Sequence, residues 1–296
     1  CVWCIVKQAK EGVFNPTEGA FIASLKDERR SLEKVAIGKT RVFTAGNVAL
    51  TLAIRRYFLS YVKFVCDNRI ENEIGLGINA YSLDWQKLYK KITSKPAVIA
   101  GDFSNFDGSL NSQILHRIPK VINKWYSDGE ENARVRETLF EYLVNATVVM
   151  GDSMFILNHS QPSGNPLTTL INCMYNMFIF RYCYLILKKK EGAAQTLMDF
   201  DKNVSCVFCG DDSILGVSSR IINWFNQITL TEVMATTGHT YTDEAKTGNI
   251  VPYRSIDEVT FLKRGIKDGG RRCPLDKETI EDMGMWITKE PNTPNT

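Results

Sequence analysis

Two adjacent carboxylates at a glycine-led turn are the residues of this sequence whose types and spacing most directly suggest chemistry. Asp211 and Asp212 follow Gly210, and apolar runs at 204–208 and 214–217 flank them. The pattern predicts a β-hairpin whose tip presents the two acids. Two like charges held together are unfavourable unless a cation neutralises them. An ordinary solvent-exposed turn is the alternative explanation, so the rest of the chain must decide.

A second acidic turn lies upstream. The apolar run 97–100 leads directly into a turn that contains Asp102 and Asp107. We expect this run to be a central strand with Asp102 at its carboxyl end. A surface loop with two acids is the alternative. Together, Asp102, Asp211 and Asp212 could hold two divalent cations about 3.5–4 Å apart, which would clamp the attacking and leaving oxygens of a phosphoryl displacement. Oxygen-only ligands suit Mg²⁺, and Mn²⁺ could replace it.

Cations that could neutralise a triphosphate are concentrated in residues 26–41. This segment has a surplus of three positive charges, equal to the net charge of +3 of the whole chain. Their irregular spacing beside a predicted strand at 40–44 does not fit an amphipathic helix, so we expect phosphate binding rather than only a solvated surface. The basic residues are Lys26, Arg29, Arg30, Lys34, Lys39 and Arg41.

A compact loop at 161–166 leads into a long helix predicted at 167–189. Backbone amides at such a glycine-containing loop favour an anion or a sugar hydroxyl. Thr168 and Asn172 are four residues apart, so they share one face of the helix.

The elements that must position these residues follow from hydrophobic periodicity and turn signals. Further helices are predicted at 48–66, after Ser82, and at 113–125, 131–143 and 221–236. A hairpin is predicted at 145–157 with its turn at Gly151-Asp152, and a strand at 259–264.

Composition indicates a folded globular protein with a substantial core, since 44% of the 296 residues are hydrophobic and 23% are charged. No stretch reaches the roughly 18 uncharged apolar residues of a membrane span, so no transmembrane segment is expected. The chain starts without Met or a basic leader, which indicates a fragment or a piece of a polyprotein. The eight cysteines are expected to be reduced thiols; Cys206 and Cys209, three apart on a strand, would point to opposite faces and not share zinc.

These motifs together resemble those of viral RNA-dependent RNA polymerases of the picornavirus-like superfamily. Asp102-Phe103-Ser104-Asn105-Phe106-Asp107 resembles motif A, and this run of residues is similar to motif A of the insect dicistrovirus group. The run Ser163-Gly164-Asn165-Pro166-Leu167-Thr168-Thr169-Leu170-Ile171-Asn172 resembles motif B, and Cys209-Gly210-Asp211-Asp212 resembles motif C. Lys246 stands where motif D has its lysine, Phe261-Leu262-Lys263-Arg264 resembles motif E, and the segment 26–41 resembles motif F. One departure is Cys209, where picornaviruses usually have tyrosine.

The resemblance implies an α+β right-hand polymerase fold, whose palm is an antiparallel sheet packed on helices. It divides the chain into partial fingers with motif F (1–57), palm (58–144), a fingers hairpin (145–161), palm again (162–266) and the start of a thumb (267–296). Such polymerases are longer, so a first fingers segment and most of the thumb are expected to be missing, and activity of the fragment alone is not implied.

The resemblance also implies roles for individual residues. Asp102 and Asp211 would be the principal metal ligands, with Asp212 assisting, and Lys246 would protonate the leaving pyrophosphate. The ribose 2′-hydroxyl would be recognised by Asp107 together with Ser163, Gly164, Thr168 and Asn172. The triphosphate would be neutralised by Lys26, Arg30, Lys34, Lys39 and Arg41, and the nascent RNA backbone would be held by Lys263 and Arg264.

The implied partners are an RNA template, nascent RNA, ribonucleoside triphosphates, other viral replication proteins and a protein primer. The implied location is the host cytoplasm, at membrane-associated replication complexes. Two alternatives remain open from the residues: a reverse transcriptase-like polymerase, which Asp107 and Asn172 disfavour, and an inactive RNA-binding domain on the same palm, which the intact set of acids disfavours.

Overall fold

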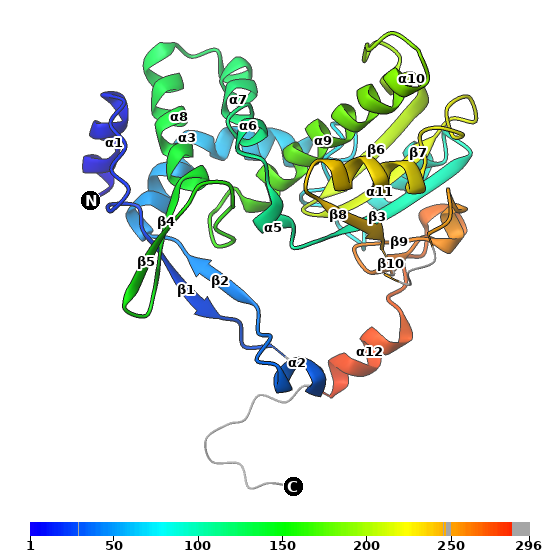
Figure 1. Ribbon diagram of the computed structural model, residues 1–296, viewed down its shortest axis with the longest axis horizontal. Helices are drawn as coiled ribbons and strands as arrows, with labels where there is room; N and C mark the ends of the chain where they lie inside the picture. Colours follow the sequence, from blue (N-terminus) through cyan, green and yellow to red (C-terminus); the bar gives the residue numbers. More distant parts are fainter. Residues whose placement is uncertain (29, 245, 247–249, 286–296) are drawn as a thin grey trace, which may run out of the picture.

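The computed structural model describes residues 1–28, 30–244, 246 and 250–285. Arg29 and the polar tail predicted at 289–296 lie outside the described residues. Helices and largely antiparallel strands are both present, as expected of an α+β protein (Figure 1).

A four-stranded antiparallel sheet of order β6-β7-β3-β8 presents both acidic turns. Side chains alternate between its faces because successive strand residues point in opposite directions. Ile99 and Phe103 join the core beneath α9 and α11, whereas Val98 and Ala100 pack with α4. The bounds of these elements are β3 Ala97–Ser104, β6 Val204–Cys209, β7 Asp212–Val217, β8 Thr240–Asp243, α4 Asp84–Ile92, α9 Thr168–Lys190 and α11 Gln227–Thr236.

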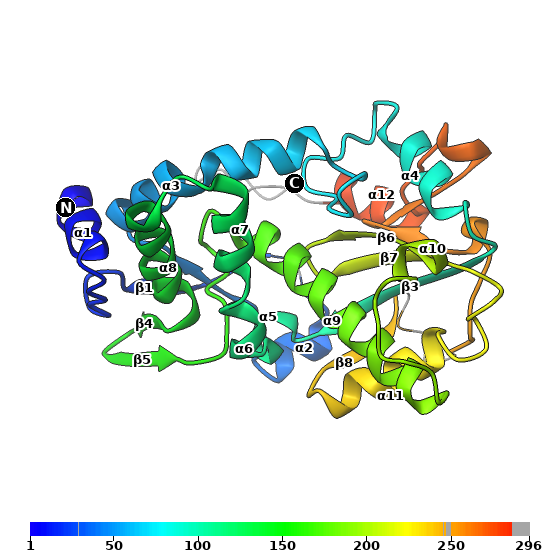
Figure 2. The same ribbon diagram turned by 90° about the horizontal axis from the view of Figure 1, so that it is seen from above.

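A second four-stranded sheet has the order β2-β1-β4-β5, and its β1–β4 pair is parallel. The β4–β5 hairpin confirms the prediction at 145–157, and its turn residue Gly151 has a φ of 58°. Helices α1, α3 and α8 pack together beside this sheet (Figure 2). The bounds are α1 Val2–Lys10, β1 Phe21–Leu25, β2 Val42–Ala45, α3 Val48–Asp67, α8 Glu130–Val144, β4 Ala146–Met150 and β5 Ser153–Leu157.

The long helix α9 runs through the core. Among the described residues it is the helix whose length and apolar composition would suffice to cross a membrane, and 67% of its apolar window is buried inside the protein. The prediction of a buried helix at 167–189 is therefore confirmed. Its polar residues Asn172 and Asn176 are buried, at 6% and 0% exposure. Burial of an amide is unfavourable unless it forms hydrogen bonds, so the contacts of these two side chains matter for the site.

Three predicted elements were wrong in extent. The helix at 113–125 is two helices, because Pro119 lacks an N–H and fits only at the start of the second one. The helix at 221–236 begins only at Gln227, where the Asn226 side chain caps it. The strand at 259–264 is two short strands joined by Leu262 and Lys263, both with positive φ.

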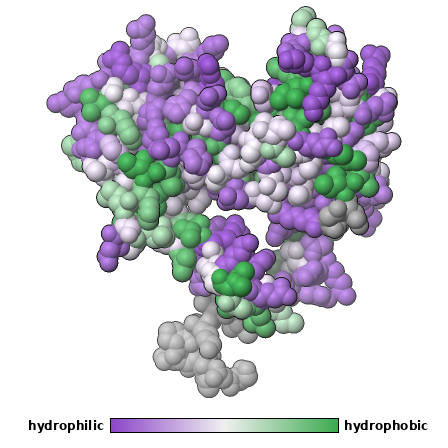
Figure 3. Space-filling model, in the orientation of Figure 1, coloured by the Kyte–Doolittle hydropathy of each residue, from purple (hydrophilic) through white to green (hydrophobic). Residues whose placement is uncertain are grey.

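The remaining helices are short, and one of them forms a projection. In Figure 1, β1 and β2 lead away from the main body to α2, and Figure 3 shows a green patch over this projection. Its apolar residues Leu32, Val35 and Ile37 are 86%, 60% and 73% exposed. The remaining bounds are α2 Leu32–Ala36, α5 Phe106–Ser109, α6 Ser112–Leu115, α7 Ile118–Tyr126, α10 Phe200–Asn203, β9 Thr260–Phe261, β10 Arg264–Gly265 and α12 Lys277–Gly284.

Candidate active site

The Gly210-Asp211 turn joins β6 to β7 and is held by α9. Cys209 pairs with Asp212 across the hairpin, and Gly210 has a φ of 69°, which glycine adopts without strain. The Asn176 side chain donates a hydrogen bond of 2.8 Å from Nδ2 to the Gly210 carbonyl. The Gly210 N–H donates to Cys173 Sγ at 3.2 Å. The predicted hairpin is confirmed, and a buried helix fixes its tip.

Asp102 is brought to the same turn by the pairing of β3 with β7. Gly101 lies opposite Ser213, so the next residue along β3, Asp102, lies beside Asp212. The Asp102 carboxylate also forms an ion pair with Lys246, whose Nζ is 2.6 Å from Oδ2. The structure thus brings together Asp102, Asp211, Asp212 and Lys246, although Asp102 and Asp211 are 109 positions apart in the sequence.

The electrostatics of the three acids are those of crowded like charges. Partial desolvation raises the pKa of Asp211, and the negative charges of Asp102 and Asp107 raise it further. Desolvation, with the charges of Asp211 and Asp102, raises the pKa of Asp212 to about 7, although Lys263 and Lys246 oppose this shift. A cation at this position would relieve the repulsion.

The donor set fits divalent magnesium in chemistry, because all three side chains offer carboxylate oxygens. Across residues 1–28, 30–244, 246 and 250–285, however, no three acidic, histidine or cysteine side chains are already grouped as a metal site. Lys246 pairs with Asp102 in this arrangement. The predicted ligands are therefore neighbours, and their assignment as a metal site stays a prediction.

A second polar pair, Asp107 and Asn172, joins α5 to α9. Asn172 Nδ2 donates to Asp107 Oδ1 at 3.1 Å, and Asn172 Oδ1 is buried with no hydrogen-bond partner in the described part of the chain. Burial raises the pKa of Asp107, and the hydrogen bond from Asn172 and the charges of Lys26 and Arg41 partly oppose this. The pair therefore presents an unused acceptor and lies within electrostatic range of two predicted nucleotide-binding cations.

The loop before α9 is held by its own hydrogen bonds. Thr168 Oγ1 donates to the Ser163 carbonyl at 3.0 Å, so its hydroxyl is engaged within the loop. A Cβ at Gly164 would lie 1.7 Å from the Thr44 carbonyl oxygen, because the loop bridges to β2 at Ala45. Only glycine permits this approach, and it ties the loop to the strand that follows the basic segment.

The predicted nucleotide-binding cations are divided between two environments. The Lys26 side chain lies near Asp107, and the backbone N–H of Lys26 donates a hydrogen bond to the Arg41 carbonyl at 2.8 Å. Arg30 pairs with Glu28 at 2.6 Å, and Arg41 approaches the same carboxylate at 3.4 Å. The other two, Lys34 and Lys39, are exposed on the α2 projection.

The two predicted RNA-binding residues of the β9–β10 turn diverge. Lys263 is close enough to Asp212 for its charge to lower the pKa of that carboxyl. Arg264 instead donates from Nη1 to the Cys273 carbonyl at 2.9 Å, and its guanidinium lies 5.8 Å from the Tyr81 ring centroid. The structure therefore places only Lys263 beside the acids.

Sequence reasoning missed the residues that support the turn. Asn176 and Cys173 contact Gly210 from α9, and the strand-like bridge between Ile74 and Phe208 supports it from another side. One signal was present: Asn176 lies one helical turn after Asn172 in a mainly apolar part of the helix. The contact from Ile74 had no such signal.

Comparisons with known proteins agree with this geometry. The family model described as "Viral RNA-dependent RNA polymerase" matches residues 4–295. The chain is 41% identical over 293 residues to the replicase polyprotein of Acute bee paralysis virus, covering 95% of this chain and 15% of that polyprotein. It is also 41% identical over 289 residues to the replicase polyprotein of Cricket paralysis virus, covering 92% of this chain and 16% of that protein.

Among solved structures, the Sicinivirus 3Dpol RNA-dependent RNA polymerase matches with a TM-score of 0.80 and 22% sequence identity. The match covers 97% of this chain and 59% of that one. The likeness confirms the expected fold class, and the chain spans only part of the length of each of these proteins.

Proposed function

This chain belongs to the family of viral RNA-dependent RNA polymerases, and we propose that it carries the catalytic centre of an enzyme that copies RNA from ribonucleoside triphosphates. The observation that carries the proposal is the convergence of Asp102, Asp211 and Asp212 at one end of strands β3, β6 and β7. The same helix, α9, holds both the acidic turn and the Asp107–Asn172 pair.

In this proposal, Asp102, Asp211 and Asp212 would hold two Mg²⁺ ions, which Mn²⁺ could replace. Bound metal would supply Lewis-acid stabilisation of the attacking and leaving oxygens. Lys246, which forms an ion pair with Asp102, would donate a proton to the pyrophosphate leaving group. Lys26 and Arg41 would neutralise the triphosphate, with Arg30, Lys34 and Lys39 along its entry path.

Recognition of the sugar would depend on Asp107 and Asn172. The ribose 2′-hydroxyl can both donate and accept a hydrogen bond, and the buried Asn172 Oδ1 offers an acceptor. Ser163 and Gly164 would shape this pocket, whereas Thr168 would act by holding the loop. Lys263 would contact the nascent strand; Arg264 would need to leave its bond to Cys273 to do the same.

The proposal extends to the organisation and setting of the protein. Residues 1–57 and 145–161 would be fingers, 58–144 and 162–266 palm, and 267–296 the start of a thumb. The partners would be template RNA, nascent RNA, other viral replication proteins and a protein primer, in host cytoplasm at membrane-associated replication complexes. The kinship with replicase polyproteins of insect viruses supports this setting.

Primer extension on an RNA template tests the function. A full-length polymerase that contains this chain should extend an RNA primer with ribonucleotides in the presence of Mg²⁺, and poorly with deoxynucleotides. Preference for deoxynucleotides would instead support the reverse transcriptase-like alternative. RNA binding with no extension would support an inactive palm.

A further inference from the structure

A small cavity lies at the edge of the catalytic sheet, where two partners of β3 diverge. β8 pairs with β3 only from Gly101 onward, and the segment around Arg254 pairs with it at Val98. Between these points the edge at Ile99 and Ala100 is left open. The resulting cavity measures about 180 Å³. The described residues that line it include Ile99, Ala100, Gln227, Asp243, Val251 and Arg254.

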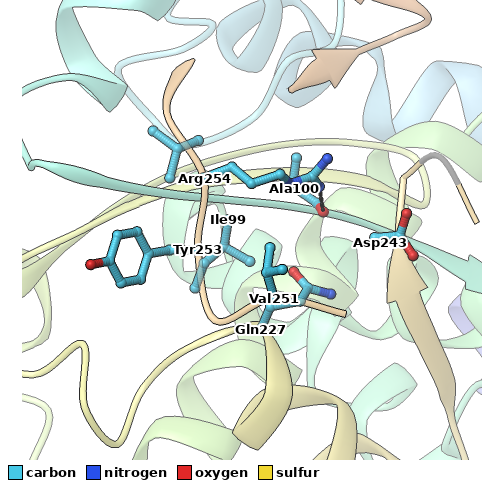
Figure 4. A pocket seen from close by; sticks show the side chains of 8 residues that line it. Ile99, Ala100, Gln227, Asp243, Val251, Tyr253 and Arg254 are labelled. Carbon is cyan, nitrogen blue, oxygen red and sulfur yellow. Dashed lines mark hydrogen bonds between the residues drawn. The ribbon is translucent and has the colours of Figure 1, made fainter. Parts of the chain in front are cut away.

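Gln227 is the residue that indicates a ligand. Its side chain is 3% exposed, yet neither Oε1 nor Nε2 has a hydrogen-bond partner in the part of the chain that the structure describes. Figure 4 shows its amide rising from the start of α11 toward the space between Val251 and Asp243, while the Tyr253 ring points away. A buried amide left without partners is unfavourable, because the hydrogen bonds it would make in water are not replaced. The amide therefore offers a donor and an acceptor to an occupant.

The charges around the cavity disfavour an anion. The Arg254 guanidinium is paired with Glu244 and also donates to the Ala100 carbonyl at 3.4 Å, so its positive charge is already neutralised. The buried carboxylate of Asp243 lies on another wall. Arg254 is the cation among the described lining residues, and its charge is already paired, so a phosphate would gain little there and we infer a neutral occupant.

The size and the apolar floor indicate a single ring. An engineered cavity of about 150 Å³ is known to bind benzene, so this cavity has room for one six-membered ring. Val98, Ile99, Ala100 and Val251 supply apolar contacts. A glutamine amide pairs in bidentate fashion with a base edge that carries a donor next to an acceptor.

We propose that this cavity binds a pyrimidine nucleobase through the Gln227 amide. Uracil, with its N3–H beside a carbonyl oxygen, would satisfy both Gln227 atoms at once. This cavity is separate from the proposed catalytic centre but lies next to it, because the backbone N–H of Lys246 donates to the Asp243 carbonyl at 3.0 Å. The base can come from a free nucleotide or from an RNA strand, because both present the same edge.

Titration of the isotope-labelled chain with uridine, followed by NMR of side-chain amide resonances, tests the proposal. Uridine should shift the Gln227 amide resonance, and 3-methyluridine, which lacks the N3 donor, should bind at least tenfold more weakly. Gln227→Leu should abolish this difference, and its melting temperature establishes that it is folded. If Gln227→Leu does not fold, Gln227→Glu removes the donor with little change of shape and should also weaken uridine binding.

Equal binding of uridine and 3-methyluridine would overturn the proposal, as would unchanged affinity in a folded Gln227 variant. Absence of any Gln227 shift up to the solubility limit of uridine would mean that the cavity holds only water. Uridine triphosphate and a short oligouridylate form the last two arms of the titration. The arm that shifts Gln227 at lower concentration identifies the source of the base.

Discussion

Asn176→Leu should separate nucleotide incorporation from stability, because Asn176 makes one hydrogen bond to the Gly210-Asp211 turn and its second amide atom has no partner among the described residues. The substitution removes the 2.8 Å bond to the Gly210 carbonyl, which costs about 1–3 kcal/mol if that carbonyl finds no other donor. It also removes the buried Oδ1, which has no partner among the residues that the structure describes. Removing that unsatisfied acceptor recovers a similar amount.

The free energy of unfolding should therefore change by no more than about 1 kcal/mol. The rate of nucleotide incorporation should fall much further, because a misplacement of about 1 Å can cost on the order of a hundredfold in rate. The assay is single-turnover primer extension by a full-length polymerase containing this chain, with thermal unfolding measured in parallel. Met177→Leu is the matched control, since this neighbouring side chain lines a pocket with Tyr61 and Phe64, and the described lining of that pocket does not include the Gly210-Asp211 turn.

An Asn176→Leu enzyme with the parental incorporation rate would refute the argument that this bond positions the acidic turn. A loss of several kcal/mol in stability would refute the other half of the calculation. In that case the Asn176 amide would have partners beyond Gly210.

Three further substitutions test other parts of the site. Asn172→Leu removes the bond to Asp107 and should erode the preference for ribonucleotides about tenfold or more; an unchanged ribo/deoxy ratio in competition assays would remove Asn172 from sugar recognition. Lys246→Leu should slow single-turnover chemistry about a hundredfold and shift its pH profile, whereas an unchanged rate would exclude the general-acid role. Burial lowers the pKa of His239 below its ordinary 6.5, so native stability should fall as pH drops below about 7, by at most about 1.4 kcal/mol per pH unit. His239→Gln should reduce that slope in chemical denaturation, and an identical slope would contradict the linkage.

The sequence was most informative where a short motif fixes both the chain geometry and the chemistry. The Gly210 turn needs a residue with positive φ and places Asp211 at its tip, so hairpin and acids could be predicted together. Asp102 could be placed because an apolar strand precedes it directly. The antiparallel pairing of β3 with β7 then brings the two motifs side by side.

Contacts between distant segments could not be predicted in the same way. Arg264 looks equivalent to Lys263 in sequence, but two consecutive residues with positive φ turn the chain there, and its guanidinium bonds to the Cys273 carbonyl. Thr168 shares a helix face with Asn172, yet its hydroxyl is used by the Ser163 carbonyl. Such choices depend on which acceptor is nearest in three dimensions, and residue spacing does not reveal that.

Replacing Asp211 with its uncharged isostere tests the central claim most directly. In single-turnover extension on an RNA template with Mg²⁺, Asp211→Asn should abolish ribonucleotide incorporation, while its melting temperature stays close to that of the parent. Asp201→Asn is the matched control, because that carboxylate is 83% exposed and pairs with Arg181; it should retain the parental rate. Near-parental incorporation by Asp211→Asn would contradict the account, because the Gly210-Asp211 turn would then not be the catalytic centre.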